Sequence, residues 1–475
     1  MSPSVLASPK QAFKVTIALS MAWILTMGGA LSKPESHAAP AESAAQAQLP
    51  NVLFIVTDDQ RAKGTMTMMP KTLGWFKKKG TRYPEAFATT PLCCPARGSI
   101  FTGRFAHNHG LFRSNPDPSV FEQDSTMQAY LKGRGYQTAI VGKYLNAWDV
   151  AVDPPYFDRW SNFSRGFYNG SKGYTDLTFN IEGNVRSISR YSTHFIRDQS
   201  VGYLDWFEKR DSQPWFLYVS PFAPHAPAQP AHAYRNERVP EWSLNPAVLE
   251  EDRTDKPPFI QATRVPLDRL AKERRLQLRT LMSVDDMVDK ILRKTKNNGE
   301  LRDTLAVFMT DNGVLWGEHG RRTKSLPYTH SLRIPLFIRR PGQSQPAVDK
   351  RVVTNLDLAP SVLDAVGVSP DPAYPVDGRS LFDPSWTRDR LLSEFWRLDN
   401  YDVPTWASLR TPTYQYVEYY NKQESAITFR EYYDLTADPW QLENLLHEGE
   451  PPGVDLEALS RQLAQDRACS GETCP

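Results

Sequence analysis

The chain has 475 residues, of which 40% are hydrophobic and 23% charged, a composition that suits one large globular unit or a large and a small domain. A fibrous or disordered protein is thereby excluded. Its 56 Lys and Arg residues nearly balance its 54 Asp and Glu residues, which leaves a formal net charge of +2. This balance argues against nucleic acid or an anionic membrane as the main partner, so any recognition of an anion must be local.

The first 50 residues resemble an export signal followed by a spacer. Two lysines precede an interrupted apolar run at residues 15–31, and a stretch rich in Ala, Ser, Pro and Gln follows it. A membrane span needs roughly 20 predominantly apolar residues, so an uncleaved anchor is the less favoured alternative. We predict a signal peptide at residues 1–38, a flexible spacer at 39–50, and a secreted, periplasmic or otherwise extracytoplasmic protein without a stable membrane span.

Five short, mostly apolar runs predict buried strands. They lie at residues 52–56, 138–141, 215–219, 305–309 and 335–338. Helix-like stretches lie between them, for example at 125–133 and 267–296. Alternating strands and helices build a mainly parallel sheet that is covered on both faces. We therefore predict an α/β domain at residues 51–387.

The pattern changes in the last part of the chain. Aromatic and polar residues alternate at 414–419, extended sequence continues at 431–445, and a helical stretch follows at 454–466. We predict a small second domain at residues 388–475, made of an antiparallel sheet and a terminal helix.

The four cysteines fall into two pairs with different surroundings. Cys469 and Cys474 lie near the C-terminus, where export would favour a disulfide that closes a short loop. Cys93 and Cys94 are adjacent, and adjacent cysteines rarely pair with each other because the geometry is strained. At least one of these two needs another explanation.

Polar residues follow four of the predicted strands, at the edge where ligands collect in parallel sheets. They are Asp58 and Asp59 after the first strand, Lys143 after the second, His225 after the third, and Asp311 and Asn312 after the fourth. We expect one crevice to gather them. Carboxylates that meet there would repel one another without a cation, and oxygen ligands favour a hard ion such as calcium or magnesium.

The segment CCPARGSIFTGR, from Cys93 to Arg104, resembles the signature of the sulfatase family, Cys-x-Pro-x-Arg followed by Thr-Gly-Arg. The resemblance implies an alkaline-phosphatase-like fold and conversion of Cys93 to formylglycine by a formylglycine-generating enzyme. One hydroxyl of the hydrated aldehyde would attack sulfur, and the other would expel sulfate. Pro95 suits the first turn of a helix whose positive end faces the sulfate, and Arg97 could hold the diol. Two buried cysteines before an ordinary helix are the alternative.

The same resemblance implies roles for the other polar residues. The residues that match the metal site of the family, with calcium favoured over magnesium, are Asp58, Asp59, Asp311 and Asn312, together with Cys93. Lys143 and Lys324 would bind sulfate oxygens, and His225 would give a hydrogen bond or a proton to the leaving oxygen. His319 and Asn146 are further candidates for substrate contacts. Many sulfatases have a histidine where this chain has Leu145, so the proton shuttle of the second step has no assigned residue.

Finer features resemble the branch that contains N-acetylglucosamine-6-sulfatases, arylsulfatases and related glycan sulfatases. They include Leu-Cys-Cys-Pro, Phe-Ala-His-Asn-His-Gly and Lys-Tyr-Leu-Asn. A sulfate ester on a sugar, a polysaccharide or an aryl group is therefore the implied substrate. One alternative is a phosphonate monoester hydrolase or phosphodiesterase with the same fold. The other is a non-catalytic protein that binds sulfated glycans through Lys143, Lys324 and the pair Arg321 and Arg322.

Overall fold

The computed structural model describes residues 49–113, 120–146, 148–163, 173–399 and 401–475. The predicted signal peptide and nearly all of the predicted spacer lie outside the described residues. Residues 49–475 form one compact unit. Within its described part, none of the helices has the length and apolar character needed to cross a bilayer.

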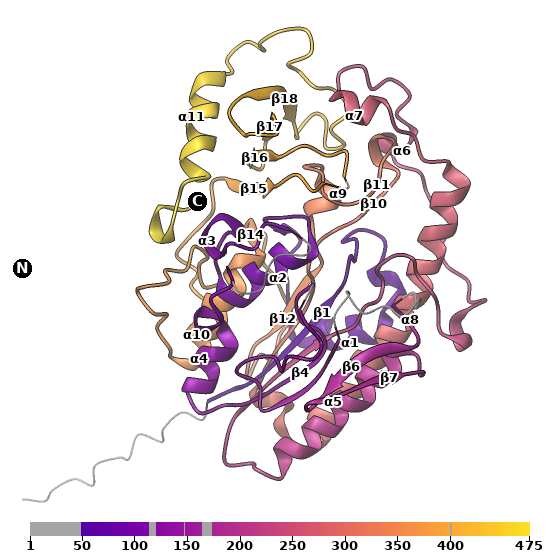
Figure 1. Cartoon of the computed structure of the whole chain (residues 1–475), viewed down its shortest axis with the longest axis vertical. Helices are drawn as coiled ribbons and strands as arrows, with labels where there is room; N and C mark the ends of the chain where they lie inside the picture. Colours follow the sequence, from indigo (N-terminus) through magenta and orange to yellow (C-terminus); the bar gives the residue numbers. More distant parts are fainter. Residues whose placement is uncertain (1–48, 114–119, 147, 164–172, 400) are drawn as a thin grey trace, which may run out of the picture. The chain divides into compact units, whose positions relative to one another are not determined.

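In the described part of the chain, the largest element is a ten-stranded mixed sheet with the strand order β13-β2-β12-β9-β1-β8-β4-β5-β6-β7 (Figure 1). Its central strands run parallel to one another. They are β9 (Thr304–Thr310), β1 (Asn51–Thr57), β8 (Trp215–Ser220), β4 (Gln137–Lys143) and β5 (Arg159–Phe163). Antiparallel pairs join the outer strands to this centre on both sides. The outer strands are β12 (Leu336–Arg339), β2 (Thr81–Arg82), β13 (Ala347–Val348), β6 (Leu177–Ile181) and β7 (Asn184–Ile188).

Helices cover both faces of this sheet. Alternate residues of each central strand point to opposite faces, and because both sets are apolar, both faces must be buried. On β1, Leu53 and Ile55 pack in one hydrophobic cluster, and Val52 and Phe54 pack in another. The first cluster includes residues of α1 (Pro70–Lys79), α5 (Ser192–Glu208) and α8 (Leu267–Asn297). The second includes residues of α2 (Cys93–Thr102), α4 (Met127–Gly133) and α10 (Leu358–Val366). Burial on both faces explains the continuous apolar runs in the sequence.

The predicted α/β fold is confirmed. The five predicted strands are present as β1, β4, β8, β9 and β12, each within two residues of its predicted ends. The long predicted helix is α8, and the shorter one is α4. The remaining short elements are β3 (Ala86–Phe87), α3 (Ala106–His109), α6 (Pro246–Leu249), α7 (Pro258–Gln261), β10 (Leu315–Trp316), β11 (Arg322–Thr323), α9 (Thr329–Leu332) and β14 (Val353–Thr354).

A separate four-stranded antiparallel sheet follows near the C-terminus, as predicted. Its strands are β15 (Leu391–Phe395), β16 (Trp406–Arg410), β17 (Tyr414–Tyr420) and β18 (Ile427–Asp434), and the helix α11 (Leu456–Asp466) comes after them. The expectation of extended structure as far as residue 445 is wrong. The carboxylate of Asp438 accepts hydrogen bonds from the backbone N–H groups of Trp440 and Glu443, which folds this segment into turns. The domain boundary at residue 388 stays a prediction.

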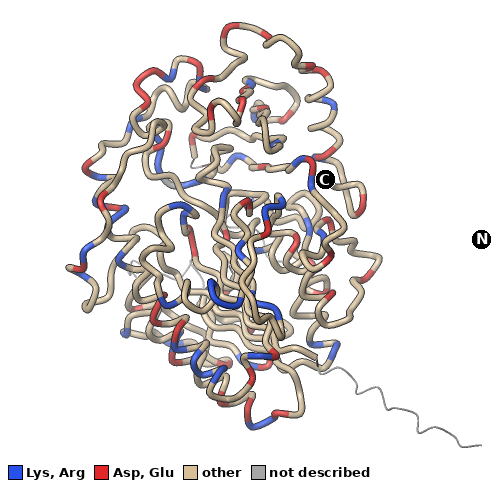
Figure 2. Tube along the Cα trace, turned by 180° about the vertical axis from the view of Figure 1, so that it is seen from behind, with Lys and Arg blue, Asp and Glu red and all other residues tan. Residues whose placement is uncertain are grey.

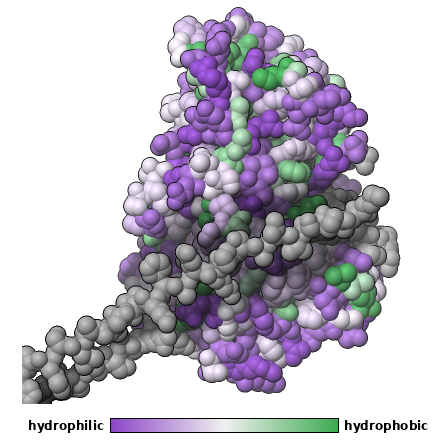
Figure 3. All heavy atoms as spheres, turned by 60° about the vertical axis from the view of Figure 1, so that its left-hand side comes forward, coloured by the Kyte–Doolittle hydropathy of each residue, from purple (hydrophilic) through white to green (hydrophobic). Residues whose placement is uncertain are grey.

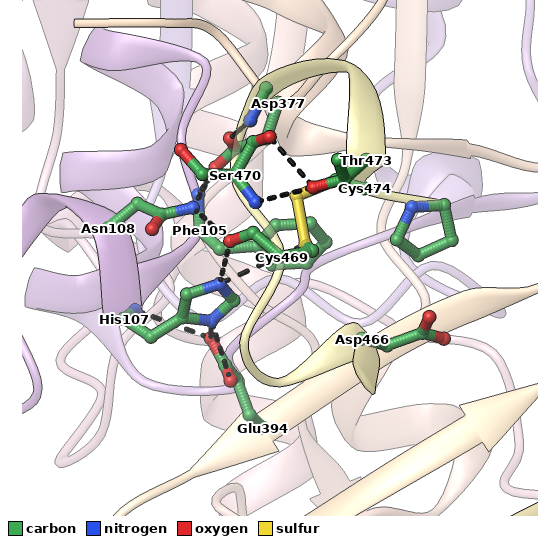
Figure 4. The surroundings of a disulfide bond; sticks show 12 residues. Phe105, His107, Asn108, Asp377, Glu394, Asp466, Cys469, Ser470, Thr473 and Cys474 are labelled. Carbon is green, nitrogen blue, oxygen red and sulfur yellow. Dashed lines mark hydrogen bonds and ion pairs between the residues drawn. A yellow bond between two sulfur atoms is a disulfide. The ribbon is translucent and has the colours of Figure 1, made fainter. Parts of the chain in front are cut away.

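Cys469 and Cys474 form a disulfide in the tail that follows α11 (Figure 4). The backbone carbonyl of Cys469 accepts a hydrogen bond from Asn108 Nδ2 at 2.9 Å and lies 3.0 Å from His107 Nε2. The other ring nitrogen of His107 contacts Glu394 at 2.8 Å. The disulfide loop is therefore tied to α3, the short helix that follows α2.

Charged residues of both signs are interspersed along the described chain (Figure 2), in line with the small net charge. Hydrophilic residues cover most of the described surface that is visible in Figure 3, and apolar residues form small patches between them.

Candidate active site

The carboxyl ends of β1, β4, β8 and β9 meet at one edge of the sheet, because these four strands are parallel neighbours. Asp58 and Asp59 follow β1, Lys143 ends β4, and Asp311 follows β9. All four side chains are buried. The structure therefore brings together residues that lie up to 253 positions apart in the sequence.

Cys93 is the first residue of α2, and every residue of this helix is buried. Its Sγ lies 3.2 Å from Asp58 Oδ1, 3.8 Å from Asp59 Oδ1 and 2.7 Å from Lys324 Nζ. Pro95 lies in the first turn. Because the cluster surrounds Cys93 at the N-terminal end of α2, it faces the positive end of the helix dipole. Burial, and then the negative charge of Asp58, raise the pKa of Cys93 to about 12. The unmodified thiol is consequently neutral near pH 7.

Three buried carboxylates are matched by three buried cationic side chains. Lys143 Nζ donates to Asp58 Oδ2 at 2.6 Å, Lys324 Nζ contacts Asp59, and Arg97 Nε donates to Asp311 Oδ2 at 2.9 Å. Burial alone would raise the pKa of Asp58, but the nearby positive charges, first that of Lys143, hold this pKa well below its usual value. Charges are tolerated at this depth only when they are paired.

Asp311 and Asn312 are tied to the other members of the cluster. Asp311 Oδ1 accepts hydrogen bonds from the backbone N–H groups of Asp59 at 3.1 Å and Asn312 at 2.9 Å. Asn312 Nδ2 donates to Asp59 Oδ1 at 2.7 Å. Gly313 allows the turn, because a Cβ atom there would lie 2.3 Å from the backbone oxygen of His330. Burial and the charge of Asp58 raise the pKa of Asp311.

Arg97 connects the ends of two strands through hydrogen bonds of one terminal nitrogen, and its other terminal nitrogen has no hydrogen-bond partner among the described residues. Its Nη1 donates to the backbone oxygen of Lys143 at 3.1 Å and to Ser220 Oγ at 2.7 Å. Its Nη2 is buried, has no hydrogen-bond partner among the described residues, and lies 4.0 Å from Asp58 Oδ2. Ser220 was missed in the sequence, although its place directly after a predicted strand was the signal that could have found it.

His225 lies at the mouth of the cluster. Its Nε2 is 3.5 Å from Asp59 Oδ2, its Nδ1 faces the carbonyl oxygen of Ala226, and its ring packs on Phe222 at 4.7 Å between centroids. The hydroxyl of Tyr174 donates to the backbone oxygen of His225 at 2.9 Å. These contacts orient Nε2 toward the carboxylates.

The donor set fits a hard divalent cation. One possible ligand atom from each of Asp58, Asp59, Cys93 and His225 lies within 4.8 Å of the others. This group differs from the predicted set by including His225 and omitting Asp311 and Asn312. The two oxygens of Asp311 are engaged by Arg97 and by backbone N–H groups. Both sets include the carboxylates of Asp58 and Asp59, and carboxylate oxygens are the ligands that calcium and magnesium prefer.

The two further candidates for substrate contacts are His319 and Asn146. His319 is buried, its Nδ1 contacts Glu250 Oε2 at 2.9 Å, and its ring packs on Tyr328 at 4.0 Å between centroids. Asn146 is buried after β4, and neither polar atom of its side chain has a hydrogen-bond partner in the described ranges. The structure does not bring either side chain into contact with Cys93.

A cavity of about 720 Å³ opens over Asp59, His225 and Lys324. A second cavity of about 440 Å³ shares Lys324, Arg322 and Tyr401 with it. The first cavity is also lined by residues of α8, which carry no sequence motif and therefore could not be assigned to the site beforehand.

Comparison with known proteins supports the resemblance in the sequence. The family model described as Sulfatase matches residues 50–368, and the model described as N-sulphoglucosamine sulphohydrolase, C-terminal, matches residues 317–468. The chain belongs to the sulfatase family. Since the first match includes all the residues of the Cys93 cluster, the family assignment covers the whole candidate site.

Two sulfatases align with most of the chain. An extracellular sulfatase SULF-1 homolog of Drosophila melanogaster is 32% identical over 78% of this chain, which spans 34% of the length of that relative. N-acetylglucosamine-6-sulfatase of Capra hircus is 29% identical over 90% of this chain and 84% of its own length.

A solved structure of a protein in complex with its substrate D-glucosamine-2-N,6-O-disulfate is also similar. It matches with a TM-score of 0.73 and 21% identity, over 88% of this chain and 96% of that one. At this level of identity the similarity shows a shared fold.

Proposed function

We propose that the protein hydrolyses sulfate esters, so that water and the ester yield an alcohol and inorganic sulfate. The observation that carries this proposal is the position of Cys93, the first residue of a buried helix, in contact with two carboxylates and the ammonium group of Lys324. Family membership supports the same reaction.

We propose that a formylglycine-generating enzyme modifies Cys93, which would supply an oxygen nucleophile in place of the neutral thiol. Around it, Arg97 would use Nη2, which has no hydrogen-bond partner among the described residues, to hold the nucleophile and neutralise charge. Lys143 and Lys324 would bind sulfate oxygens, and Nε2 of His225 would donate a proton or a hydrogen bond to the leaving oxygen.

The charges of the cluster support a role for a divalent cation. Its three carboxylates are already balanced by Arg97, Lys143 and Lys324. A sulfate group adds negative charge, and a bound Ca²⁺ would supply the positive charge that draws sulfate oxygens into the site. The residues that would hold this ion are Asp58, Asp59, Asp311 and Asn312, with modified Cys93. Both lysines would then be available for the substrate. Magnesium is the second candidate.

A sulfated sugar or polysaccharide is the substrate that we propose, and an aryl sulfate would serve as a simpler ester. The names of the relatives and the size of the cavities support a sugar. We also propose export, on the pattern of the first 38 residues and the extracellular sulfatase named among the relatives.

The test is hydrolysis of nitrophenyl sulfate and of a nitrophenyl phosphonate by protein that is co-produced with a formylglycine-generating enzyme. We expect sulfate release to dominate, and to disappear in Cys93→Ala and after chelation of calcium. Dominant turnover of the phosphonate would keep the site but replace the reaction. Absence of turnover with the nitrophenyl esters and with sugar sulfates alike, in protein shown by mass spectrometry to carry formylglycine, would reject the proposed function.

A further inference from the structure

The wall of the active-site cavity beyond Lys324 is basic. Arg269 and Lys272 of α8 and Arg322 of β11 line the larger cavity together with Lys324. Glu273 is the acidic residue of this wall, and its Oε1 contacts both Arg322 Nη1 at 3.0 Å and Arg269 Nε at 3.2 Å. One carboxylate therefore forms ion pairs with two guanidinium groups, and the wall keeps a net positive charge.

Two residues of α8 bring positive charge to this wall. Lys272 is exposed and has no carboxylate partner among the described residues. Arg269 lies in the first turn of α8, where the helix dipole disfavours a positive charge, and its i,i+4 pair with Glu273 offsets part of that cost. An anion in the cavity would add a further favourable partner for this guanidinium group.

The basic wall begins beside the reacting group. Arg322 and Lys324 are separated by one residue and line the same two cavities. Lys324 Nζ contacts Cys93 Sγ, so Arg322 lies next to the place where the scissile sulfate would bind. The cavities hold about 720 and 440 Å³, which leaves room for a sugar with more than one substituent.

We propose that Arg269, Lys272 and Arg322 form a binding site for a second anionic group of the substrate. This group is a sulfate or a carboxylate, either on the sugar that carries the scissile sulfate or on the adjoining sugar. The preferred substrate is thus a glycan with at least two negative charges, and Glu273 is a positioning residue that orients both arginines. The inference rests on the proposed function, because it takes the scissile sulfate to bind at Lys324.

The test compares kcat/KM for matched substrates. Glucosamine 6-O-sulfate carries one anion, glucosamine-2-N,6-O-disulfate adds a sulfate on the same sugar, and a disaccharide of 6-O-sulfated glucosamine and a uronic acid adds a carboxylate on the neighbour. We expect the wild-type enzyme to prefer at least one of the two dianionic substrates by about tenfold, and the preferred one identifies the source of the anion. This preference should shrink as salt is raised.

In Lys272→Ala and Arg322→Gln we expect the ratio of dianionic to monoanionic kcat/KM to fall toward one. Arg275→Ala is the matched control, because Arg275 is an exposed basic residue of the same helix outside the cavity lining. It should keep the wild-type ratio. A wild-type enzyme without any preference, or a preference that survives in both variants, would overturn the proposal.

Failure of the proposed function gives a different result, since no sulfate ester would then be hydrolysed, nitrophenyl sulfate included. In that case titration calorimetry with glucosamine-2-N,6-O-disulfate tests the anion site by itself. Weaker binding by Lys272→Ala than by Arg275→Ala would support the site, and equal binding would overturn it.

Discussion

The clusters around Cys93 and around Glu431 both contain buried carboxylates, but the partners of these carboxylates differ. Around Cys93, three carboxylates are each matched by a lysine or an arginine. In the C-terminal sheet, buried Glu431 accepts hydrogen bonds from the hydroxyls of Tyr328 at 2.9 Å, Tyr419 at 2.8 Å and Tyr433 at 2.9 Å.

The difference shows in the pKa values. The cationic partners outweigh burial at Asp58 and lower its pKa, whereas at Glu431 burial prevails over the charge of Lys256 and the hydroxyl groups, and the pKa is raised. A metal ion or a sulfate could replace ionic partners within the first cluster. In the second cluster the direct hydrogen-bond donors to Glu431 are neutral tyrosine hydroxyls, with the charge of Lys256 nearby. We infer that the first cluster serves binding and chemistry and the second serves stability.

The largest effect should come from the nucleophile. Cys93→Ala is expected to lower kcat/KM for nitrophenyl sulfate by at least about a thousandfold, because it removes the group that forms the covalent bond. Cys94→Ala is the matched control, since Cys94 is equally buried but its Sγ faces the backbone oxygen of Asn146 at 4.0 Å. Initial rates and thermal unfolding of both variants check this. If Cys94→Ala lost activity and Cys93→Ala did not, the assignment of the nucleophile to Cys93 would be wrong.

The next effect should come from the oxygen ligands. Asp59→Asn keeps the size of the side chain, and asparagine tolerates the positive φ of 60° at this position. We expect activity to fall by about a hundredfold. Calcium at a hundred times its Kd should stabilise the wild-type protein by about 2.7 kcal/mol. Differential scanning calorimetry with and without calcium measures this, and equal stabilisation of wild type and variant would contradict the assigned ligand.

A buried ion pair outside both clusters tests what charge pairing contributes to stability. Arg61 Nη2 lies 2.7 Å from Glu318 Oε1, and although burial opposes ionisation, this partner lowers the pKa of Glu318 from 4.5 to about 2. Because the folded pKa is depressed, the contribution is complete above pH 4.5 and is lost as pH falls through about 2. Glu318→Gln should therefore cost about 3 kcal/mol at pH 7.

Urea unfolding of wild type and Glu318→Gln at several pH values below 7 measures this pair. The difference between the two free energies of unfolding should shrink as the pH falls below 4.5. A difference that does not depend on pH would show that the pair contributes through packing and not through charge.

The smallest effect should come from the cluster around Glu431. Glu431→Gln replaces an oxygen acceptor by an NH₂ group that cannot accept from a tyrosine hydroxyl, which should cost about 1–3 kcal/mol of unfolding free energy. We expect kcat/KM to stay within about twofold of wild type. Glu457→Gln, on the exposed side of α11, is the matched control and should change neither quantity. A large loss of activity in Glu431→Gln would mean that the two clusters are coupled.

Much of the site could be predicted because its residues lie at the ends of predicted strands or within a recognisable signature. Asp58, Lys143 and Asp311 follow apolar runs that are long enough for buried strands, and the carboxyl ends of parallel strands meet. Cys93 was recognised from a twelve-residue signature. Arg269 and Lys272 belong to no motif, since a basic residue on an amphipathic helix has the same appearance whether it faces solvent or a cavity.

Strand periodicity and short motifs are local properties, so the amino-acid sequence predicted the class of fold, the family, the candidate nucleophile and the set of oxygen donors. The three-dimensional fold was needed to show which cation pairs with which carboxylate, that Ser220 supports Arg97, and that His319 packs on Tyr328. It also decided which face of α8 lines the cavity. These are distances between segments far apart in the chain, and they depend on how helices pack against the sheet.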